Sequence, residues 1–311
     1  MKKTQVQNIT IKEDQAGQRL DNYLFTLLKT VPKTRIYRII RKGEVRANKK
    51  RIKQTYRLQA GDIIRIPPLE IAEKPQKPQP GQSVIKFLAT RVLFEDENLL
   101  IINKPAGIPV HGGSNVAIGI IEALRFMKPE LDGLELAHRL DKDTSGCLLI
   151  AKKRKILKEL HELLRNGEVK KIYHALTKGH WKKTALRVDA PLHKNVLKSG
   201  ERIVRVDDEG KNSVSTFKVL KKYTASSLME VLLETGRTHQ IRVHAQYRRH
   251  SIACDDKYGD KEFNKSIRET GLKRLFLHAY SLEFSLPSYD KPIKITAPLD
   301  KDLADCLKAL E

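Results

Sequence analysis

The first 66 residues show apolar positions at both helical and strand-like spacing. Within residues 18–28, Leu and Tyr recur at helical intervals and leave a polar opposite face, which predicts an amphipathic helix. Residues 32–42 predict a second helix, which places three Ile on one side and four cations largely on another. Short apolar runs indicate strands near residues 6–11, 45–48 and 62–66. The pattern predicts a small α+β domain over residues 1–66 that carries a cationic helix.

The stretch over residues 67–82 breaks this pattern. It contains five Pro with intervening Lys and Gln, and so it favours neither a helix nor a central strand. We interpret it as a semi-extended linker between the small domain and a larger one over residues 83–311.

The larger domain alternates between strand-like and helical patterns. Apolar or alternating runs predict strands at residues 92–96, 98–103, 147–151, 169–177, 217–220 and 228–234. Helices are expected at residues 116–127 and 153–164 and from about Thr238 onward. In that last helix, Ile241 and Val243 are not expected to face the core together with Arg242. The polar stretch over residues 195–211 predicts a mobile excursion.

Charge changes the picture more than any other bulk property. The 311 residues hold 60 Lys and Arg against 37 Asp and Glu, a formal net charge of +23. The excess is uneven, because residues 1–80 hold 19 cations against 7 anions. A field of this sign attracts polyanions, so nucleic acid is the expected partner, in preference to a role in solubility alone.

The cysteines and the apolar stretches indicate the compartment. Cys147, Cys254 and Cys306 are odd in number and too far apart for a Cys-x-x-Cys site, which fits a reducing cytoplasm. Two Lys follow the first Met without an apolar core, and no segment approaches eighteen consecutive apolar residues. We therefore expect a cytoplasmic protein with no membrane partner.

A polar loop over residues 138–146 leads directly into the apolar run that starts at Cys147. Such a loop can hold a carboxylate in a fixed, reachable position, and Asp141 is the candidate. A calcium loop is excluded because its twelfth position, which must supply a Glu, is Lys152. A kinase catalytic loop is excluded by an extra Leu before the Asp and by the lack of an Asp-Phe-Gly sequence. A simple surface turn, in which the side chains bond their own backbone, remains open.

The same loop, His138-Arg139-Leu140-Asp141-Lys142-Asp143-Thr144-Ser145-Gly146, resembles the second motif of pseudouridine synthases of the RluA family. Lys104-Pro105-Ala106-Gly107 resembles the first family motif, and residues 236–245 and 252–259 resemble the third motif and the segment after it. Cys254 stands where members often have Gly. The resemblance implies an α+β synthase domain with a mixed, mainly antiparallel sheet flanked by helices and loops.

The resemblance also implies roles for individual residues. Asp141 is the implied catalytic residue, acting either as a nucleophile at C1′ or by removing a ribose proton. Arg242 is the implied ion-pair partner, about 4 Å from it. Tyr173, by pattern alone a core or edge residue of a strand, is implied to lie against the uracil and to accept the C5 proton directly or through water. Arg139 either fills the space of the turned-out base or contacts a phosphate.

The basic N-terminal region resembles the S4 RNA-binding domain. Its Arg-Leu-Asp opening appears at residues 19–21 and its Gly-x-Val-x-x-Asn turn at residues 43–48. The candidate RNA-binding residues are Arg35, Arg38, Arg41, Lys42, Arg46, Lys49, Lys50 and Arg51. The alternative is that these cations only solvate a small pair of helices.

Together, these resemblances imply an enzyme that converts specific uridines of large-subunit ribosomal RNA to pseudouridine. A monomer without a metal or a small-molecule cofactor is expected. His239 and His244 are five residues apart, off the spacing of helical zinc ligands, and are not expected to bind a metal. Two alternatives remain open: a non-catalytic RNA-binding or ribosome-assembly protein, and a family member that acts on transfer RNA.

Overall fold

The computed structural model describes residues 2–71, 79–113, 116, 118–131, 133–196 and 202–311. The chain divides into two compact units, Met1–Pro78 and Gln79–Glu311. The first unit extends further than the predicted domain over residues 1–66, because Leu69 is buried in its core and β6 (Glu70–Ile71) pairs with β1 (Lys2–Lys3). The two Pro that precede this pairing lie outside any strand, where they remove no ladder hydrogen bond. Residues 72–78 of the predicted linker lie outside the described residues.

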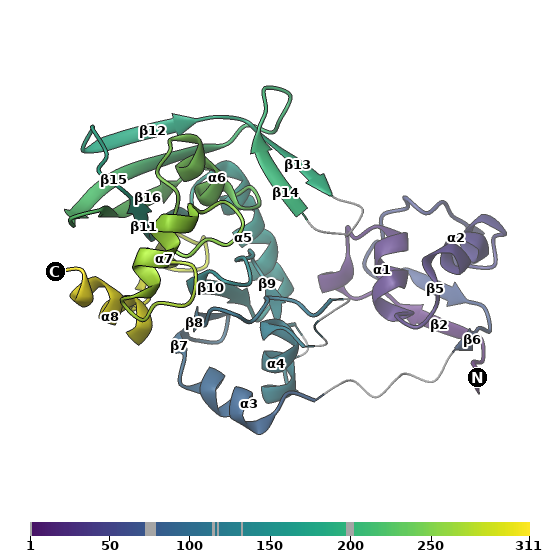
Figure 1. Ribbon diagram of the computed structural model, residues 1–311. Helices are drawn as coiled ribbons and strands as arrows, with labels where there is room; N and C mark the ends of the chain where they lie inside the picture. Colours follow the sequence, from purple (N-terminus) through teal and green to yellow (C-terminus); the bar gives the residue numbers. More distant parts are fainter. Residues whose placement is uncertain (1, 72–78, 114–115, 117, 132, 197–201) are drawn as a thin grey trace. The chain divides into compact units, whose positions relative to one another are not determined.

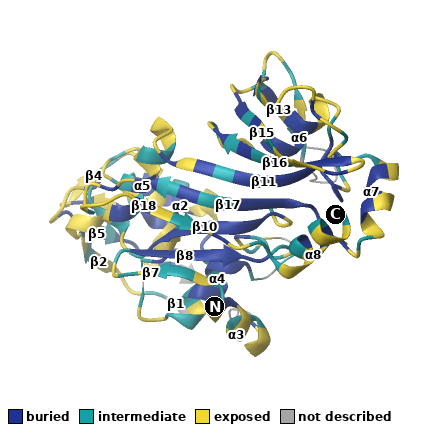
Figure 2. Ribbon diagram, turned by 90° about the vertical axis from the view of Figure 1, so that its left-hand side faces the viewer, coloured by how far each residue is buried: buried dark blue, intermediate teal, exposed yellow. Residues whose placement is uncertain are grey.

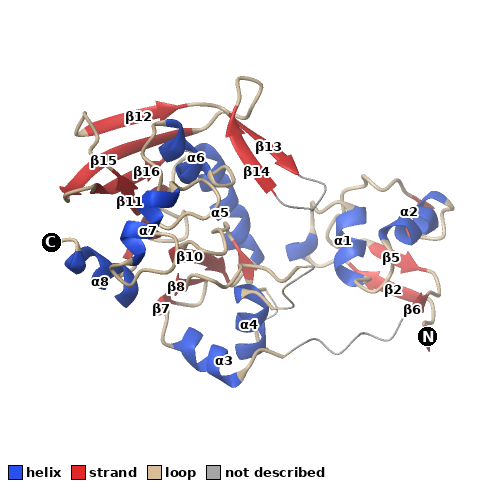
Figure 3. Cartoon of the chain, viewed as in Figure 1, coloured by secondary structure: helices blue, strands red, loops and turns tan. Residues whose placement is uncertain are grey.

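The first unit combines a small sheet with two helices, as the pattern predicted. Its sheet has the order β2-β5-β3-β4 and is drawn in red beside its helices in Figure 3. The elements are β2 (Gln7–Thr10), a 3-10 turn (Glu13–Gln15), α1 (Leu20–Leu27), α2 (Lys33–Arg41), β3 (Arg46–Ala47), β4 (Lys50–Arg51) and β5 (Ile63–Ile66). Ile36, Ile39 and Ile40 of α2 are buried against Leu20 and Leu24 of α1 and against β5. The apolar face predicted for α2 is therefore confirmed.

The second unit is built on a sheet of ten strands (Figure 1). Its main path is β12-β15-β16-β11-β17-β10-β8-β7, with β18 beside β17 and β9 beside β10. The strands are β7 (Val92–Glu95), β8 (Leu99–Lys104), β9 (Glu135–Leu136), β10 (Ser145–Ala151), β11 (Lys170–Lys178), β12 (Ala185–Asp189), β15 (Val214–Lys222), β16 (Ser226–Leu233), β17 (Leu277–Phe284) and β18 (Ile293–Thr296). Only the pairing of β10 with β17 is parallel among the described ladders of this sheet. The predicted mixed, mainly antiparallel sheet is confirmed.

Both faces of the central strands are covered, which explains why β8 and β10 are buried along their whole length (Figure 2). The helices of this unit are α3 (Gln82–Ala89), α4 (Ile120–Met127), α5 (Arg154–Asn166), α6 (Gln240–Tyr247), α7 (Lys261–Arg268) and α8 (Lys301–Ala309). Because side chains alternate along a strand, Leu148 and Ile150 pack with α4, while Leu149 packs with Ile156 and Leu160 of α5. The unit is a layered α+β domain.

One expectation about this unit is wrong, and another is tested only in part. Of the predicted mobile excursion over residues 195–211, residues 197–201 lie outside the described residues, and much of the rest belongs to a hairpin of β13 (Leu192–Val196) with β14 (Arg202–Val206), visible in Figure 3. Leu192 and Val204 anchor it against Val243. The wrong expectation concerns the helix α6, which is buried on all sides from Gln240 to Ala245: Ile241 belongs to the main core and Val243 to the hairpin cluster. Both residues are therefore buried alongside Arg242, because α6 lies between two apolar clusters.

Candidate functional site

The loop that carries Asp141 lies between β9 and β10, and the first motif holds it from behind. The Gly107 amide donates to the Lys142 carbonyl at 2.9 Å. The Lys104 Nζ, on a side chain with no exposed area, donates to the carbonyls of Pro105, Lys142 and Thr144 at 2.7, 3.0 and 2.9 Å. Two motifs whose first residues, Lys104 and His138, are 34 apart in the sequence therefore form one structural support.

The Lys104 side chain provides this support as an ammonium. Burial lowers the pKa of Lys104 to about 7, although the charges of Asp143 and Asp141 act to raise it. Three carbonyl acceptors around one nitrogen match the three N–H donors of an ammonium, whereas a neutral amine has only two. The loop is therefore held by three charge-assisted hydrogen bonds.

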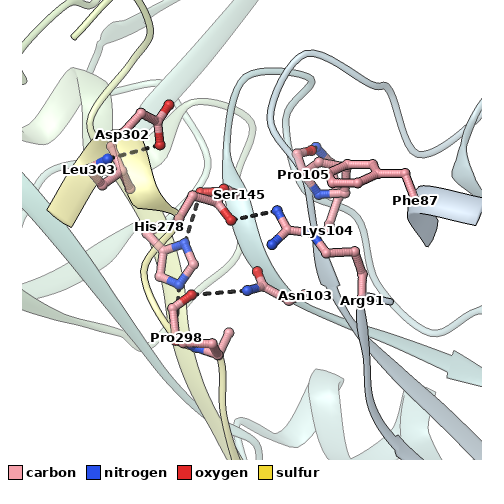
Figure 4. Close-up of polar contacts among 12 residues, drawn as sticks. Phe87, Arg91, Asn103, Lys104, Pro105, Ser145, His278, Pro298, Asp302 and Leu303 are labelled. Atoms are coloured by element: carbon pink, nitrogen blue, oxygen red, sulfur yellow. Dashed lines mark hydrogen bonds and ion pairs between the residues drawn. The ribbon is translucent and has the colours of Figure 1, made fainter. Parts of the chain in front are cut away.

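The strand after the loop is fixed by a second network, and Figure 4 shows its contact between Ser145 and His278. The Ser145 Oγ lies 2.8 Å from the His278 Nδ1 and accepts a hydrogen bond from Arg274 at 3.1 Å. The His278 Nε2 lies 3.1 Å from the Ala297 carbonyl oxygen. Gly146 has φ +107°, and a Cβ there would collide with the Ala279 carbonyl oxygen, so the close approach of β10 and β17 requires glycine.

Asp141 itself faces two cationic or titratable groups from the start of α6. Its Oδ2 lies 3.7 Å from the Arg242 guanidinium and 3.9 Å from the His239 Nε2. The Asp141 side chain keeps 26% of its area exposed, while that of Arg242 keeps 10%. Burial lowers the pKa of His239, against the opposing charge of Asp141. The predicted pairing of Asp141 with Arg242 is thus present as an attraction, without a hydrogen bond.

The stronger partner of Arg242 is Asp255, which the sequence did not single out. The guanidinium donates from Nε and Nη2 to the two oxygens of Asp255, both at 2.7 Å. Burial acts to raise the pKa of Asp255, but the bonds from Arg242 and from the amides of Tyr258 and Lys257 outweigh it and lower the pKa. Asp255 therefore fixes Arg242 and leaves the Asp141 oxygens unbound. An acidic residue in a basic chain, inside the segment after the third motif, was the available signal.

Asp141 lies where two hollows adjoin. The first hollow, of about 410 Å³, is lined by Asp141 together with Tyr173 and Lys171 of β11 and apolar side chains such as Leu277. The second, of about 1010 Å³, is lined by the carboxylates of Asp141, Asp143, Asp255 and Asp256 and by a larger number of cations, among them Lys142 and Lys273. A smaller, partly apolar space and a larger one with an excess of cations therefore share one carboxylate, that of Asp141.

Tyr173 lies in the first hollow, as expected, but its ionisation does not suit a base. Burial raises the pKa of Tyr173 above its usual value, and the nearby charge of Asp141 raises it further. A phenol in this state keeps its proton at neutral pH. This burial suits a packing or hydrogen-bond-donating role for Tyr173, while its uptake of the C5 proton, directly or through water, stays a prediction.

Arg139 is exposed and lines both hollows. In the part of the chain that the structure describes, its guanidinium has no hydrogen bond or ion pair. A planar cation that is free to move at the edge of both hollows suits either of the two roles considered for it.

The eight candidate RNA-binding cations of the first unit are all exposed on α2 and on the β3–β4 hairpin that follows it. Asn48 and Lys49 at the hairpin turn have positive φ values of 50° and 67°. The Asn48 amide donates to the buried carboxylate of Asp62 at 2.7 Å, and Tyr56 donates to the same group at 2.9 Å. The basic turn is therefore held in a fixed shape.

His239 and His244 do not form a metal pair. The His244 nitrogens lie 3.1 Å from the Ser215 Oγ and 3.0 Å from the Ala190 carbonyl oxygen, in the core. The described residues contain no group of three His, Cys, Asp or Glu side chains arranged for a metal ion. Among the described helices, none has the length and apolar character needed to cross a bilayer.

Cys254 has a structural property that the sequence did not reveal. Its φ of +55° lies in the left-handed region that favours glycine. This backbone conformation explains why glycine also suits the position. Its thiol is buried, and burial raises the pKa of Cys254 to about 11. The thiol is therefore unreactive at neutral pH.

Comparison with known proteins follows the same division of the chain. A family model described as RNA pseudouridylate synthase matches residues 98–247, and an S4 domain model matches residues 18–64. The protein named ribosomal large subunit pseudouridine synthase C of Escherichia coli K12 is 53% identical over 308 residues, covering 98% of this chain and 97% of that protein. The protein of the same name from Pasteurella multocida is 53% identical over 306 residues, covering 98% and 94%.

Solved structures agree. The structure of human RNA pseudouridylate synthase domain containing 4 covers 73% of this chain and 95% of its own, with a TM-score of 0.61 and 29% identity. The structure of the human domain containing 1 covers 74% and 90%, with a TM-score of 0.59 and 23% identity, and so supports the fold alone. This chain belongs to the RNA pseudouridylate synthase family and carries an S4 domain ahead of its synthase domain.

Proposed function

We propose that this chain converts specific uridines of large-subunit ribosomal RNA to pseudouridine. The reaction breaks the bond between N1 and C1′, turns the base while it stays bound, and joins C5 to C1′. The observation that carries the proposal is a partly exposed carboxylate, Asp141, at the junction of two hollows and 3.7 Å from a fixed guanidinium. The choice of RNA rests on the printed names of the relatives.

Asp141 acts at the sugar of the target uridine, as a nucleophile at C1′ or by taking a ribose proton. Both roles require an ionised, reachable oxygen. Arg242 favours the anion by attraction at 3.7 Å, while its two hydrogen bonds go to Asp255. The Asp141 oxygens therefore remain available to the substrate.

The two hollows divide the nucleotide between them. The first hollow receives the uracil, with Tyr173 against the ring, since its lining is partly apolar and includes Leu277. The second receives the RNA backbone, because Lys142 and Lys273 supply positive charge there. Arg139, between the two, occupies the space that the turned-out base leaves in the RNA and offsets part of the unstacking cost.

The S4 unit contributes affinity for RNA. Its eight exposed cations attract phosphate groups and release counterions when they bind. The basic turn held by Asp62 gives this surface a fixed shape. We propose that the unit holds the RNA while the synthase domain acts on the base.

We further propose that the protein acts as a monomer in the cytoplasm. All three thiols, Cys147, Cys254 and Cys306, are free and buried, which fits a reducing compartment. The isomerisation transfers no electrons and consumes no phosphate donor, so its chemistry calls for no cofactor.

The experiment measures tritium release from C5-labelled uridine in transcripts of large-subunit ribosomal RNA and of transfer RNA. We expect release from the ribosomal transcript, and less than a hundredth of it with Asp141→Asn, although this variant still binds the RNA. Asp290→Asn, an exposed aspartate that lines neither hollow, is the control and should keep its activity. If the wild type binds RNA but releases no tritium, the result favours a non-catalytic RNA-binding protein. If it releases tritium from transfer RNA alone, the result favours a family member that acts on transfer RNA.

A further inference from the structure

Lys171 is a buried cation without a partner. Its side chain is on β11, the residue is 7% exposed, and it lines the first hollow. In the described part of the chain it has no hydrogen bond or ion pair, in contrast to Lys104 with its three carbonyl acceptors. The Lys171 nitrogen is also not among the sealed, unpaired atoms of the described residues, so it opens into the hollow.

The place of Lys171 follows from the geometry of the strand. Side chains two residues apart along a strand share one face and are spaced by about 7 Å, so Lys171 is the neighbour of Tyr173 in the hollow. Asp141 lines the same hollow as these two side chains.

Among the described residues, no anion forms an ion pair with Lys171. The other titratable groups that line the hollow besides Asp141 and Tyr173 are His138, Arg139, His161, Arg237, His239 and Arg242. Burial and the charge of Lys171 lower the pKa of His138 to about 4, and the His138 Nε2 accepts the Leu149 amide at 3.1 Å, so this ring is neutral. Burial also lowers the pKa of Lys171 itself. An unpaired buried charge costs stability, which is retained only where a ligand uses the charge.

The shape of the hollow indicates which group of the substrate meets Lys171. With C1′ at Asp141 and the ring against Tyr173, Lys171 is the neighbour of Tyr173 on the same strand face, and the carbonyl oxygens are the acceptors that the uracil offers to it. A backbone phosphate is a poorer candidate for the partner of Lys171. Phosphates are attached to the sugar rather than to the base, and Lys142 and Lys273 offer them positive charge in the second hollow. A base carbonyl is therefore the expected partner.

We propose that the Lys171 ammonium donates a hydrogen bond to a carbonyl oxygen of the target uracil and stabilises the negative charge that the base gains when its bond to C1′ breaks. This inference rests on the proposed function. The electron pair of the N1–C1′ bond moves onto the ring and its carbonyl oxygens, and it returns to carbon when C5 bonds to C1′. The proton on C5 is then released to water, which is the event that the tritium assay follows. Lys171 keeps its own protons throughout and acts by electrostatic stabilisation.

The test compares Lys171→Met with Lys171→Arg and with Lys170→Met. Lys170 is the matched control, because it is the exposed neighbour on the same strand and pairs with Glu283 at 3.8 Å on the surface. Single-turnover formation of pseudouridine should fall by about 100-fold in Lys171→Met, the loss typical of one transition-state donor, while RNA affinity and its salt dependence change little. Lys171→Arg should recover part of the rate, and Lys170→Met should match the wild type.

Two further readouts separate this role from a structural one. Lys171→Met should melt at a higher temperature than the wild type, because it removes a buried, unpaired charge. A second substrate carries 5-fluorouridine at the target, where the fluorine itself stabilises the base anion. The wild type should then consume the target nucleoside only about 10-fold faster than Lys171→Met, or less.

A wild-type rate in Lys171→Met overturns the inference and leaves the proposed function standing. A rate loss that only follows weaker RNA binding, with a reduced salt dependence, also overturns it and indicates a phosphate contact instead. A wild-type protein that forms no pseudouridine in any RNA overturns both proposals together.

Discussion

Replacing Asp255 by Asn tests whether Arg242 is fixed by Asp255 or by Asp141. In the folded chain Asp255 accepts two hydrogen bonds from Arg242 at 2.7 Å, and it also accepts the amides of Lys257 and Tyr258. Asn keeps one acceptor oxygen for the amides. Its NH₂ group, however, must face a guanidinium N–H, so a buried cation loses one of its two bonds and all of the opposite charge.

The size of the effect follows from burial. Arg242 and Asp255 are 8% and 2% exposed, and removal of one member of a buried pair costs about 3–5 kcal/mol. The attraction of Asp141 at 3.7 Å, about 4.5 kcal/mol at an effective dielectric of 20 before desolvation, remains and offsets part of the loss. We expect about 3 kcal/mol of lost unfolding free energy, which lowers the melting temperature by roughly 6–12 °C in a domain of this size.

Asp255→Asn should lose more activity than its lower fraction of folded protein would explain. Once released from Asp255, the guanidinium can turn toward Asp141 and occupy the oxygens that the substrate needs. A displacement of about 1 Å at a reacting group can cost 100-fold in rate. Under conditions where the variant is fully folded, we therefore expect about 100-fold slower single-turnover formation of pseudouridine with RNA binding retained.

The assay combines urea unfolding with single-turnover kinetics, and Asp256→Asn is the control. Asp256 is the next residue and also pairs with an arginine, Arg268 at 2.6 Å, but its side chain is 84% exposed. An exposed pair contributes less than about 1 kcal/mol, so this variant should resemble the wild type in both assays. Equal unfolding free energies for Asp255→Asn and Asp256→Asn would refute the reasoning.

Four more predictions test other parts of the structure. Because the pKa of Asp255 is lowered in the folded state, its contribution is complete above the unfolded value near 4 and is lost as the pH falls through the lower folded value. The stability gap between the wild type and Asp255→Asn should therefore stay constant from pH 8 to about 5 and shrink only below about 4, as urea unfolding at each pH would measure; a gap that grows on acidification would contradict the sign. Lys104→Met should lower single-turnover activity by about 100-fold, because the Asp141 loop loses three hydrogen bonds, while filter binding of RNA stays unchanged. Gly146→Ala should lose more than about 3 kcal/mol in urea unfolding through its collision with Ala279, whereas Gly107→Ala, at φ +83° with nothing within 4 Å, should lose only about 1–2 kcal/mol. Replacing Arg38 and Arg41 by Gln should reduce the slope of log affinity against log salt by about 2, and Lys86→Gln on α3 should not.

The local pattern was enough to predict most elements of the fold. The helix α2 and the strand β10 were predictable because each has an apolar set that matches its own period and a neighbour to bury it. The hairpin β13–β14 was missed because two buried residues, Leu192 and Val204, hold it against α6, and this contact is invisible in a polar stretch. The burial of α6 on all sides was missed for the same reason, since its second apolar partner is that hairpin.

The site divides in a similar way. Asp141 and Arg242 were found through motifs, and the distance between them agrees with the expected value. What the sequence could not supply is the competition for Arg242, because Asp255 meets it only through the folding of the segment after α6. The unpaired state of Lys171 was equally hidden, since a lysine in an alternating strand normally reads as a solvent-facing residue.

The charges around Asp141 also determine how a nucleotide can enter. Arg242 lies between two carboxylates, Asp255 and Asp141, so the three groups together carry a net negative charge in a chain whose total is +23. A phosphate is repelled from this centre and attracted to the exposed cations of the second hollow, Lys142 and Lys273. The uncharged sugar and base are then the parts of the nucleotide that reach Asp141. The same excess of positive charge that gathers RNA at the surface thus directs the glycosidic bond, rather than the backbone, to the one carboxylate that can act on it.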